Sequence, residues 1–161
     1  MALSGAALST GAARAQQRPL KDQLVGTWTV VSGESTAPNG AKQQFYGATP
    51  KGVLILDAGG RFAQVIARPG RPKFKSASRF SLEATPEELK AAVMGTVANF
   101  GTWSVNEADK TLSRRNEASL IPNGEGIEQK ASVSLAGDEL KTIQVNSVTG
   151  DKAETVYRRA R

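Results

Sequence analysis

The sequence "LVGTWTVVS" (residues 24–32) is rich in β-branched and aromatic residues and follows a stretch of different composition. Such residues favour strands. Gly26 and Trp28 lie one residue apart within the run. A glycine inside a strand often marks a sharp bend. The stretch therefore predicts a first strand, bent next to a large aromatic side chain.

Similar short runs recur along residues 20–161, separated by turn residues such as those of "DAGGR" (57–61) and "LAGDE" (135–139). Paired glycines adopt positive φ at little cost, which suits tight hairpins. The predicted strands are residues 24–32, 52–57, 62–68, 100–105, 111–120, 127–135, 140–146 and 153–159. Eight consecutive strands joined mainly by hairpins are typical of an all-β, up-and-down antiparallel barrel that can hold one small ligand.

One α-helix is predicted between the third and fourth of these strands. Residues 85–88, "TPEE", form a capping box with a proline at the first helical position. Leu89, Val93 and Val97 then recur at four-residue spacing and predict one apolar helix face. We expect this helix to end between residues 98 and 101.

The chain contains no cysteine and no histidine. This composition excludes disulfides, thiol nucleophiles, thiolate–zinc sites, imidazole ligation of haem and the Ser-His-Asp triad. No group of carboxylates has the spacing of a calcium loop. We therefore expect no metal, no cofactor and no identifiable catalytic residue, and an enzyme is the less favoured interpretation.

The formal net charge is +6, from 21 Lys plus Arg against 15 Asp plus Glu. Basic residues cluster at 68–75, 114–115 and 158–161, but only 6% of the residues are aromatic and they do not alternate with the basic ones. A nucleic-acid-binding face would combine the two types. We expect a solvated basic surface and no nucleic-acid partner. No stretch is long and apolar enough to span a membrane.

Residues 1–19 differ from the remaining domain, residues 20–161, because they are rich in Ala, Ser and Gly. The sequence "ARA" (13–15), followed by Gln16, fits a small-x-small cleavage site. This pattern predicts a secretory signal peptide and a periplasmic or secreted protein. The alternative is a disordered N-terminal segment on a cytoplasmic protein.

Several segments taken together resemble the bacterial lipocalin-like domain family, a branch of the calycin-type barrels. They are "LVGTW" (24–28), "PKGVLILDAGGRF" (50–62), "RPGRPKF" (68–74), "TPEEL" (85–89), "NFGTWSV" (99–105), "SLIPN" (119–123), "LAGDEL" (135–140) and "VYRRA" (156–160). The resemblance lies in their order and spacing. It implies an eight-stranded barrel with the helix covering or flanking one end, and implies little about activity.

In the calycin pattern a first-strand tryptophan closes one barrel end, and a C-terminal arginine stacks over it. The resemblance therefore implies that Trp28 is the structural plug of this chain and Arg158 its partner, with Arg159 as the alternative. Any ligand site is then expected toward the opposite end.

Strand residues alternate between the two faces of a sheet, so each predicted strand has an inward set. The polar members of these sets are Gln64, Arg68, Arg114, Asn116 and Gln129. Buried polar groups must be paired with one another or await a ligand. An arginine in such a cavity favours a carboxylate, sulfate or phenolate. Tyr46, Phe62 and Phe100 are the candidates for the apolar wall.

Three functions fit these observations. The first is binding of a small lipophilic, possibly anionic, molecule, which requires a cavity of about 300 Å³ or more. The second is a histidine-independent cyclase or isomerase, although no carboxylate occupies an inward strand position as a base. The third is a structural or protein-interaction barrel, which would be filled and would expose an apolar patch.

Overall fold

A computed structural model describes residues 18–76, 78 and 83–161. Residues 1–17, and with them nearly all of the predicted signal segment, lie outside the described part. The elements are α1 (Leu20–Leu24), β1 (Gly26–Thr36), β2 (Lys42–Gln43), β3 (Lys51–Leu56), β4 (Arg61–Ala67), α2 (Pro86–Met94), β5 (Thr96–Asn106), β6 (Thr111–Ser119), the 3-10 turn η1 (Pro122–Gly124), β7 (Glu128–Ala136), β8 (Glu139–Val145) and β9 (Lys152–Arg159).

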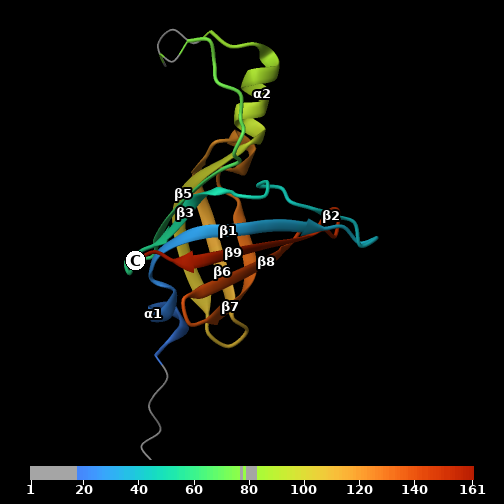
Figure 1. Ribbon diagram of the computed structural model, residues 1–161. Coiled ribbons are helices and arrows are strands. Elements are labelled where there is room, and N and C mark those ends of the chain that lie inside the picture. Colours follow the sequence, from blue (N-terminus) through green and yellow to red (C-terminus); the bar gives the residue numbers. More distant parts are fainter. Residues whose placement is uncertain (1–17, 77, 79–82) are drawn as a thin grey trace, which may run out of the picture.

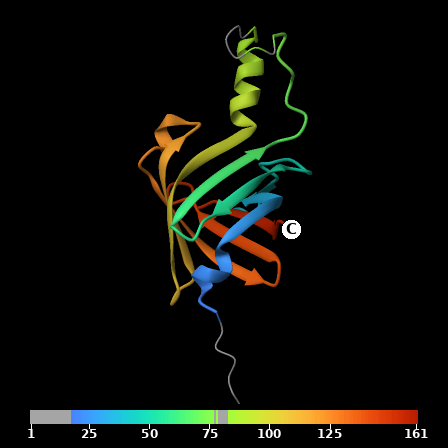
Figure 2. The same cartoon turned by 90° about the vertical axis from the view of Figure 1, so that its left-hand side faces the viewer.

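The strands form one antiparallel sheet in the order β2-β1-β3-β4-β5-β6-β7-β8-β9, and the additional pairing of β1 with β9 closes it into a barrel (Figures 1 and 2). The two-residue strand β2 only extends the edge of β1. The eight long strands are therefore an up-and-down barrel, which confirms the predicted fold. Helix α2 lies between the third and fourth long strands, β4 and β5, as predicted.

One end of the barrel is closed by Trp28 together with helix α1. The Trp28 side chain is 0% exposed, and its indole N–H donates to the carbonyl oxygen of Leu24 over 2.8 Å. The guanidinium of Arg159 lies over the indole, 4.1 Å from the ring centroid. Its Nη1 and Nη2 donate to the carbonyl oxygens of Val25 and Gln23. The arginine thus joins α1 to the barrel floor.

Arg159, rather than Arg158, is the partner of Trp28, so the prediction of Arg158 is wrong. The reason is strand alternation: the two residues point to opposite faces of β9, and Arg158 is exposed on the outside. Gly26 makes this stacking possible, since a Cβ there would lie 2.7 Å from Arg159 Nη1. Its φ of 139° also favours glycine.

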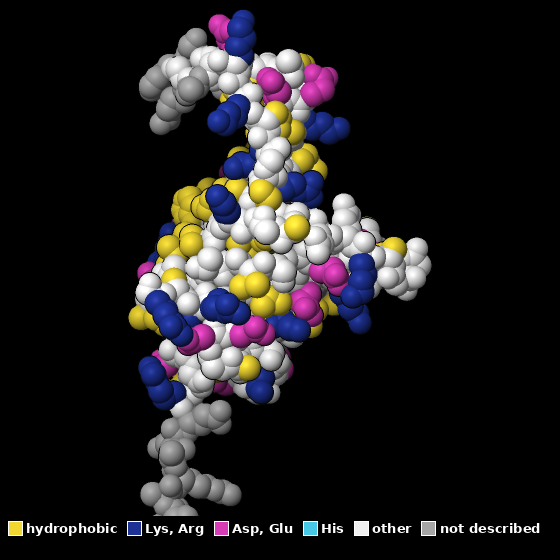
Figure 3. Space-filling model, viewed as in Figure 1, with side chains coloured by type: hydrophobic (Ala, Val, Ile, Leu, Met, Phe, Trp, Pro, Cys, Tyr) yellow, Lys and Arg dark blue, Asp and Glu magenta, His cyan; other side chains and the backbone are white. Residues whose placement is uncertain are grey.

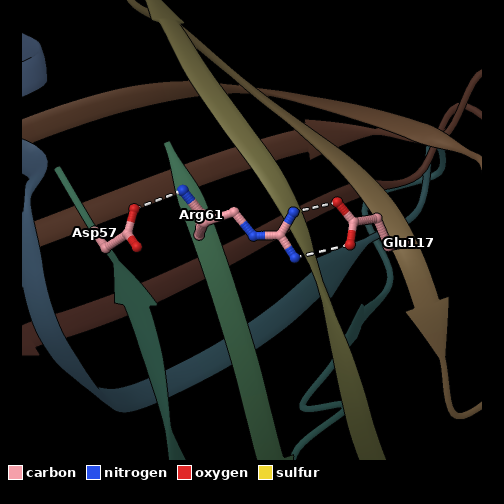
Figure 4. Close-up of polar contacts among 3 residues, drawn as sticks. All are labelled: Asp57, Arg61 and Glu117. Atoms are coloured by element: carbon pink, nitrogen blue, oxygen red, sulfur yellow. Dashed lines mark hydrogen bonds and ion pairs between the residues drawn. The ribbon is translucent and has the colours of Figure 1, made fainter. Parts of the chain in front are cut away.

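The outer wall is reinforced across three strands by Arg61 of β4 and Glu117 of β6, with β5 between them (Figure 4). Arg61 Nη2 donates to Glu117 Oε2 over 2.7 Å, and Nη1 binds Oε1. The backbone N–H of Arg61 donates to Asp57 Oδ1 over 2.6 Å and so shapes the preceding hairpin. The hydrogen bond from Arg61 lowers the pKa of Glu117. The Glu117 carboxylate is therefore ionised and paired with Arg61 on the outer face of the barrel.

Helix α2 begins with the predicted capping box of Thr85 and Glu88 but ends at Met94, earlier than expected. Val97 belongs to β5 and pairs with Ile66 of β4, because strand pairing at the barrel rim overrides the four-residue spacing. The helix projects beyond the barrel and none of its residues is buried (Figures 1 and 3). Within the described residues, no helix has the length and apolar character needed to cross a membrane.

Candidate functional site

The barrel contains a cavity of about 160 Å³, partly open to solvent, near the starts of β5, β7 and β9, at the end opposite Trp28. The lining side chains come from seven strands or loops and are mainly amides, hydroxyls and one guanidinium. They are Phe45, Tyr46, Gln64, Val97, Asn99, Arg114, Gln129, Thr142, Gln144, Ala153, Thr155 and Tyr157. The inside of this end of the barrel is thus hollow and polar.

A buried chain of hydrogen bonds runs along one wall of the cavity. Arg114 Nη1 donates to Gln64 Oε1 over 2.8 Å, and Gln64 Nε2 donates to the hydroxyl oxygen of Tyr157 over 2.8 Å. The guanidinium also lies 5.6 Å from the ring centroid of Phe62. These neutral partners fix the orientation of the arginine head group.

Arg114 is only 7% exposed, yet no carboxylate lies within ion-pair distance of it among the described residues. No Asp or Glu lines the cavity either. Burying an unpaired charge is costly, and a neutral amide compensates only part of that cost. The cavity therefore has an uncompensated positive charge at a fixed position, which an anion would neutralise.

A second unsatisfied group lies in the same wall. Asn99 Nδ2 donates to Asn116 Oδ1 over 3.3 Å, and Asn116 Nδ2 donates to the carbonyl oxygen of Gly124 over 2.9 Å. Asn99 Oδ1 is buried and has no hydrogen-bond partner. Buried polar atoms are nearly always paired. This oxygen can accept a hydrogen bond from a donor on a bound molecule.

The chain has two tyrosines, and both lie at the cavity. Burial raises the pKa of Tyr46 and of Tyr157, more than the positive charge of Arg114 lowers it. Both phenols therefore stay protonated at neutral pH. They can donate hydrogen bonds but cannot serve as bases there.

The segment Phe45–Tyr46 covers the cavity from the mouth side. The two rings meet edge to face with centroids 4.2 Å apart, and a Cβ on Gly33 of β1 would overlap the ring of Tyr46. Arg68 Nη2 donates to the carbonyl oxygen of Phe45 over 2.7 Å. A glycine on the wall and an arginine at the rim thus hold this aromatic cover in place.

The structure brings together most of the predicted site residues. Tyr46, Gln64, Arg114 and Gln129 line the cavity, and Phe62 and Asn116 are buried beside it. That these residues bind a ligand stays a prediction.

Two predicted site residues lie elsewhere. Phe100 is 46% exposed on the outside of β5, opposite Ala63 of β4, because Trp103 and Gly101 take the inward positions of that strand. Arg68 follows the last residue of β4, so the alternation of the strand does not reach it, and its side chain is exposed. Both predictions are therefore wrong for the cavity wall.

The prediction missed Asn99, Thr155 and Tyr157, among others. Once Arg159 is placed inward over Trp28, residues 157 and 155 follow inward by alternation. The predicted stacking of Arg158 over Trp28 places Tyr157 and Thr155 on the outward face of the strand instead. Likewise, the predicted inward position of Phe100 places its neighbour Asn99 on the outward face. Each miss thus follows from the assigned phase of one strand.

A closed antiparallel barrel of eight long strands with one plugged end belongs to an architecture whose interior is either filled by side chains or holds one small ligand. The sequence model of the lipocalin-like domain family matches residues 25–160, and the chain belongs to that family. No protein of curated description matches the sequence. Among the described residues, no three Asp or Glu side chains gather in a metal-binding arrangement.

Two solved structures are similar in outline. One is a de novo designed fluorescence-activating β-barrel, with a TM-score of 0.42 and 10% identity over 88% of this chain and 98% of that chain. The other is a mutant of the fluorescent protein UnaG, with a TM-score of 0.38 and 16% identity over 86% of this chain and 97% of that chain.

Proposed function

We propose that the protein binds a small organic anion inside the barrel and that Arg114 is its anchor. The observation that carries this proposal is the buried guanidinium without a carboxylate partner among the described residues. Arginine forms strong, directional hydrogen bonds with carboxylates and similar oxyanions. A ligand of this kind would neutralise the charge and occupy the cavity at once.

The volume of the cavity limits the size of the ligand. It is about 160 Å³. This is below the roughly 300 Å³ that the predicted binding of a lipophilic, drug-sized molecule requires, so the cavity does not meet that expectation. The cavity has room for on the order of five water molecules. We therefore favour a molecule the size of a short-chain or single-ring carboxylate, unless the Phe45–Tyr46 cover moves to enlarge the space.

The chemistry of the lining favours polar over lipophilic character in that ligand. Gln64, Gln129 and Gln144 contribute amides, and Asn99 offers an unpaired acceptor oxygen. The Gln64 amide is already paired with Arg114 and Tyr157, but an apolar molecule would leave the Asn99 oxygen without a partner, at a cost in free energy. We therefore propose a ligand with a hydrogen-bond donor in addition to its anionic group.

Binding is better supported than catalysis. An isomerase or cyclase needs a general base within hydrogen-bond reach of its substrate. No carboxylate lines the cavity among the described residues, and the two buried phenols are protonated at neutral pH.

Isothermal titration calorimetry with glycolate and 4-hydroxybenzoate, two small carboxylates that each carry a hydroxyl donor, tests this function. We expect one or both carboxylates to bind the wild-type protein and Arg114→Leu to weaken that binding by about ten-fold or more. Arg115→Leu is the matched control, since it removes the same charge from the adjacent, exposed position on the outer face. Equal losses in the two variants, or no binding by the wild type, would contradict the proposal.

We further propose a periplasmic or secreted location. The support is the Ala-, Ser- and Gly-rich composition of residues 1–19 and the small-x-small sequence before Gln16. Expressing the full chain in a Gram-negative host and measuring the intact mass of the periplasmic fraction tests this location. An uncleaved chain found only in the cytoplasm would refute it.

A further inference from the structure

A second, larger cleft lies outside the barrel and is lined mainly by the chain that leads from β4 toward α2. This part of the chain passes the base of helix α2 (Figure 1). Its volume is about 810 Å³, and it is open to solvent. Its lining includes Lys51, Arg68, Arg71, Lys73, Phe74 and Ala92. We call this feature the cationic cleft.

The cleft has four cationic side chains and no carboxylate among its lining residues. Neither Lys51 nor Lys73 forms an ion pair with any described residue, and the nearby Lys75 is the one that pairs with Glu83, over 3.2 Å. Like charges gathered in a concave surface focus the potential there. The cleft therefore attracts anions, and more strongly those with two charges.

The two arginines are held in place by uncharged acceptors. Arg71 Nη1 donates to Thr96 Oγ1 over 2.6 Å and its Nε to the carbonyl oxygen of Arg68 over 3.1 Å. Gly95 makes room for the side chain, because a Cβ there would lie 2.8 Å from Arg71 Cδ. Each guanidinium keeps unused N–H donors and its full charge. The positions are thus set before any anion arrives, which lowers the entropic cost of binding.

Apolar side chains form much of the remaining described lining. The half-buried side chains of Phe74 and Ala92 face the same space, together with prolines of the segment 69–72. A lining that combines cations with apolar side chains suits an ester of an oxyanion, whose head meets the cations while its body contacts the apolar side chains. Inorganic phosphate would contact the cations but would leave the apolar side chains without a partner.

We propose that the cationic cleft is a second binding site, which takes a phosphate or sulfate monoester with a hydrophobic body. It is separate from the interior cavity, since Arg114 does not line the cleft and none of the four cations lines the cavity. Arg68 is the one contact between the two, through its hydrogen bond to the carbonyl oxygen of Phe45. Both sites select anions, but the cleft accepts a larger molecule than the interior cavity can hold.

Fluorescence titration with 1-naphthyl phosphate at low ionic strength tests the proposal, with 1-naphthyl sulfate and 1-naphthol as comparison probes and inorganic phosphate as a competitor of the bound naphthyl phosphate. We expect the naphthyl phosphate to bind about ten-fold or more tightly than 1-naphthol and than inorganic phosphate. The affinity should fall as salt is added, because exposed charges are screened. Comparing naphthyl phosphate with naphthyl sulfate shows how much the second negative charge adds to the affinity. Tighter binding of both esters than of 1-naphthol supports the site.

Substitutions in the cleft and elsewhere test where the naphthyl phosphate binds. Lys51→Gln with Lys73→Gln should weaken binding of the naphthyl phosphate about five-fold or more, and Phe74→Ala should also weaken it. The matched control, Lys21→Gln with Lys110→Gln, removes two charges at the closed end and should leave the affinity unchanged. Arg114→Leu should leave it unchanged as well. Equal losses in the two double-lysine variants, or loss only in Arg114→Leu, would overturn the proposal.

Discussion

Replacing Trp28 tests whether this residue is the structural plug of the barrel. Removing a buried tryptophan side chain costs about 3–5 kcal/mol, and the total stability of a small domain is about 5–15 kcal/mol. Here the ring is 0% exposed, and its loss also deprives Leu24 O of a donor and the Arg159 guanidinium of its stacking partner. We therefore expect Trp28→Ala to lose about 4–5 kcal/mol.

Trp28→Phe separates the contribution of the aromatic ring to stability from that of the indole N–H hydrogen bond. It keeps an aromatic ring under the guanidinium but removes the indole N–H, so the expected loss is about 1–3 kcal/mol. Urea unfolding at neutral pH, followed by circular dichroism, measures both variants, with the exposed Thr29→Ala on the same strand as the control. Stabilities of Trp28→Ala and wild type within about 0.5 kcal/mol would refute the structural role.

Two further predictions concern β9 and the buried phenols. Arg159→Ala should lower the free energy of unfolding by about 2–3 kcal/mol, through lost stacking and hydrogen bonds, while Arg158→Ala should change it by less than about 0.5 kcal/mol; equal effects in urea unfolding would contradict the assignment. Because burial raises the pKa of Tyr46 and Tyr157 in the folded chain, the unfolded chain releases these protons first, at pH near 10. Stability from this source is therefore complete below about pH 10 and is lost as the pH rises further. Phenolate absorbance should appear only together with unfolding, and a reversible rise in the folded protein near pH 10 would show that the phenols are not buried.

The order of strands and turns could be predicted because each hairpin has local causes. Paired glycines, as in the turn that ends at Arg61, and alternating apolar residues are properties of neighbouring residues. The end of α2 could not be predicted in this way. Leu89 and Val93 suit a helix, but Val97 lies in β5 and pairs with Ile66 of β4, which is distant in the sequence.

The interior site depended on the phase of each strand. In β6 the apolar Leu112 shares a face with Arg114 and Asn116 and so indicates the inward face, and all three are buried as predicted. In β9 two adjacent arginines left the phase open, and a shift by one residue exchanges every inward side chain for its neighbour. In β5 the aromatic character of Phe100 suggested the core, although Trp103 sets the phase that turns Phe100 outward.

Native mass spectrometry of the protein, isolated gently from the cells that naturally produce it, tests the central claim most directly. We predict an added mass of a small organic anion, lost in Arg114→Leu and retained in Arg115→Leu. An added mass that persists in Arg114→Leu would contradict the claim that Arg114 anchors a ligand inside the barrel.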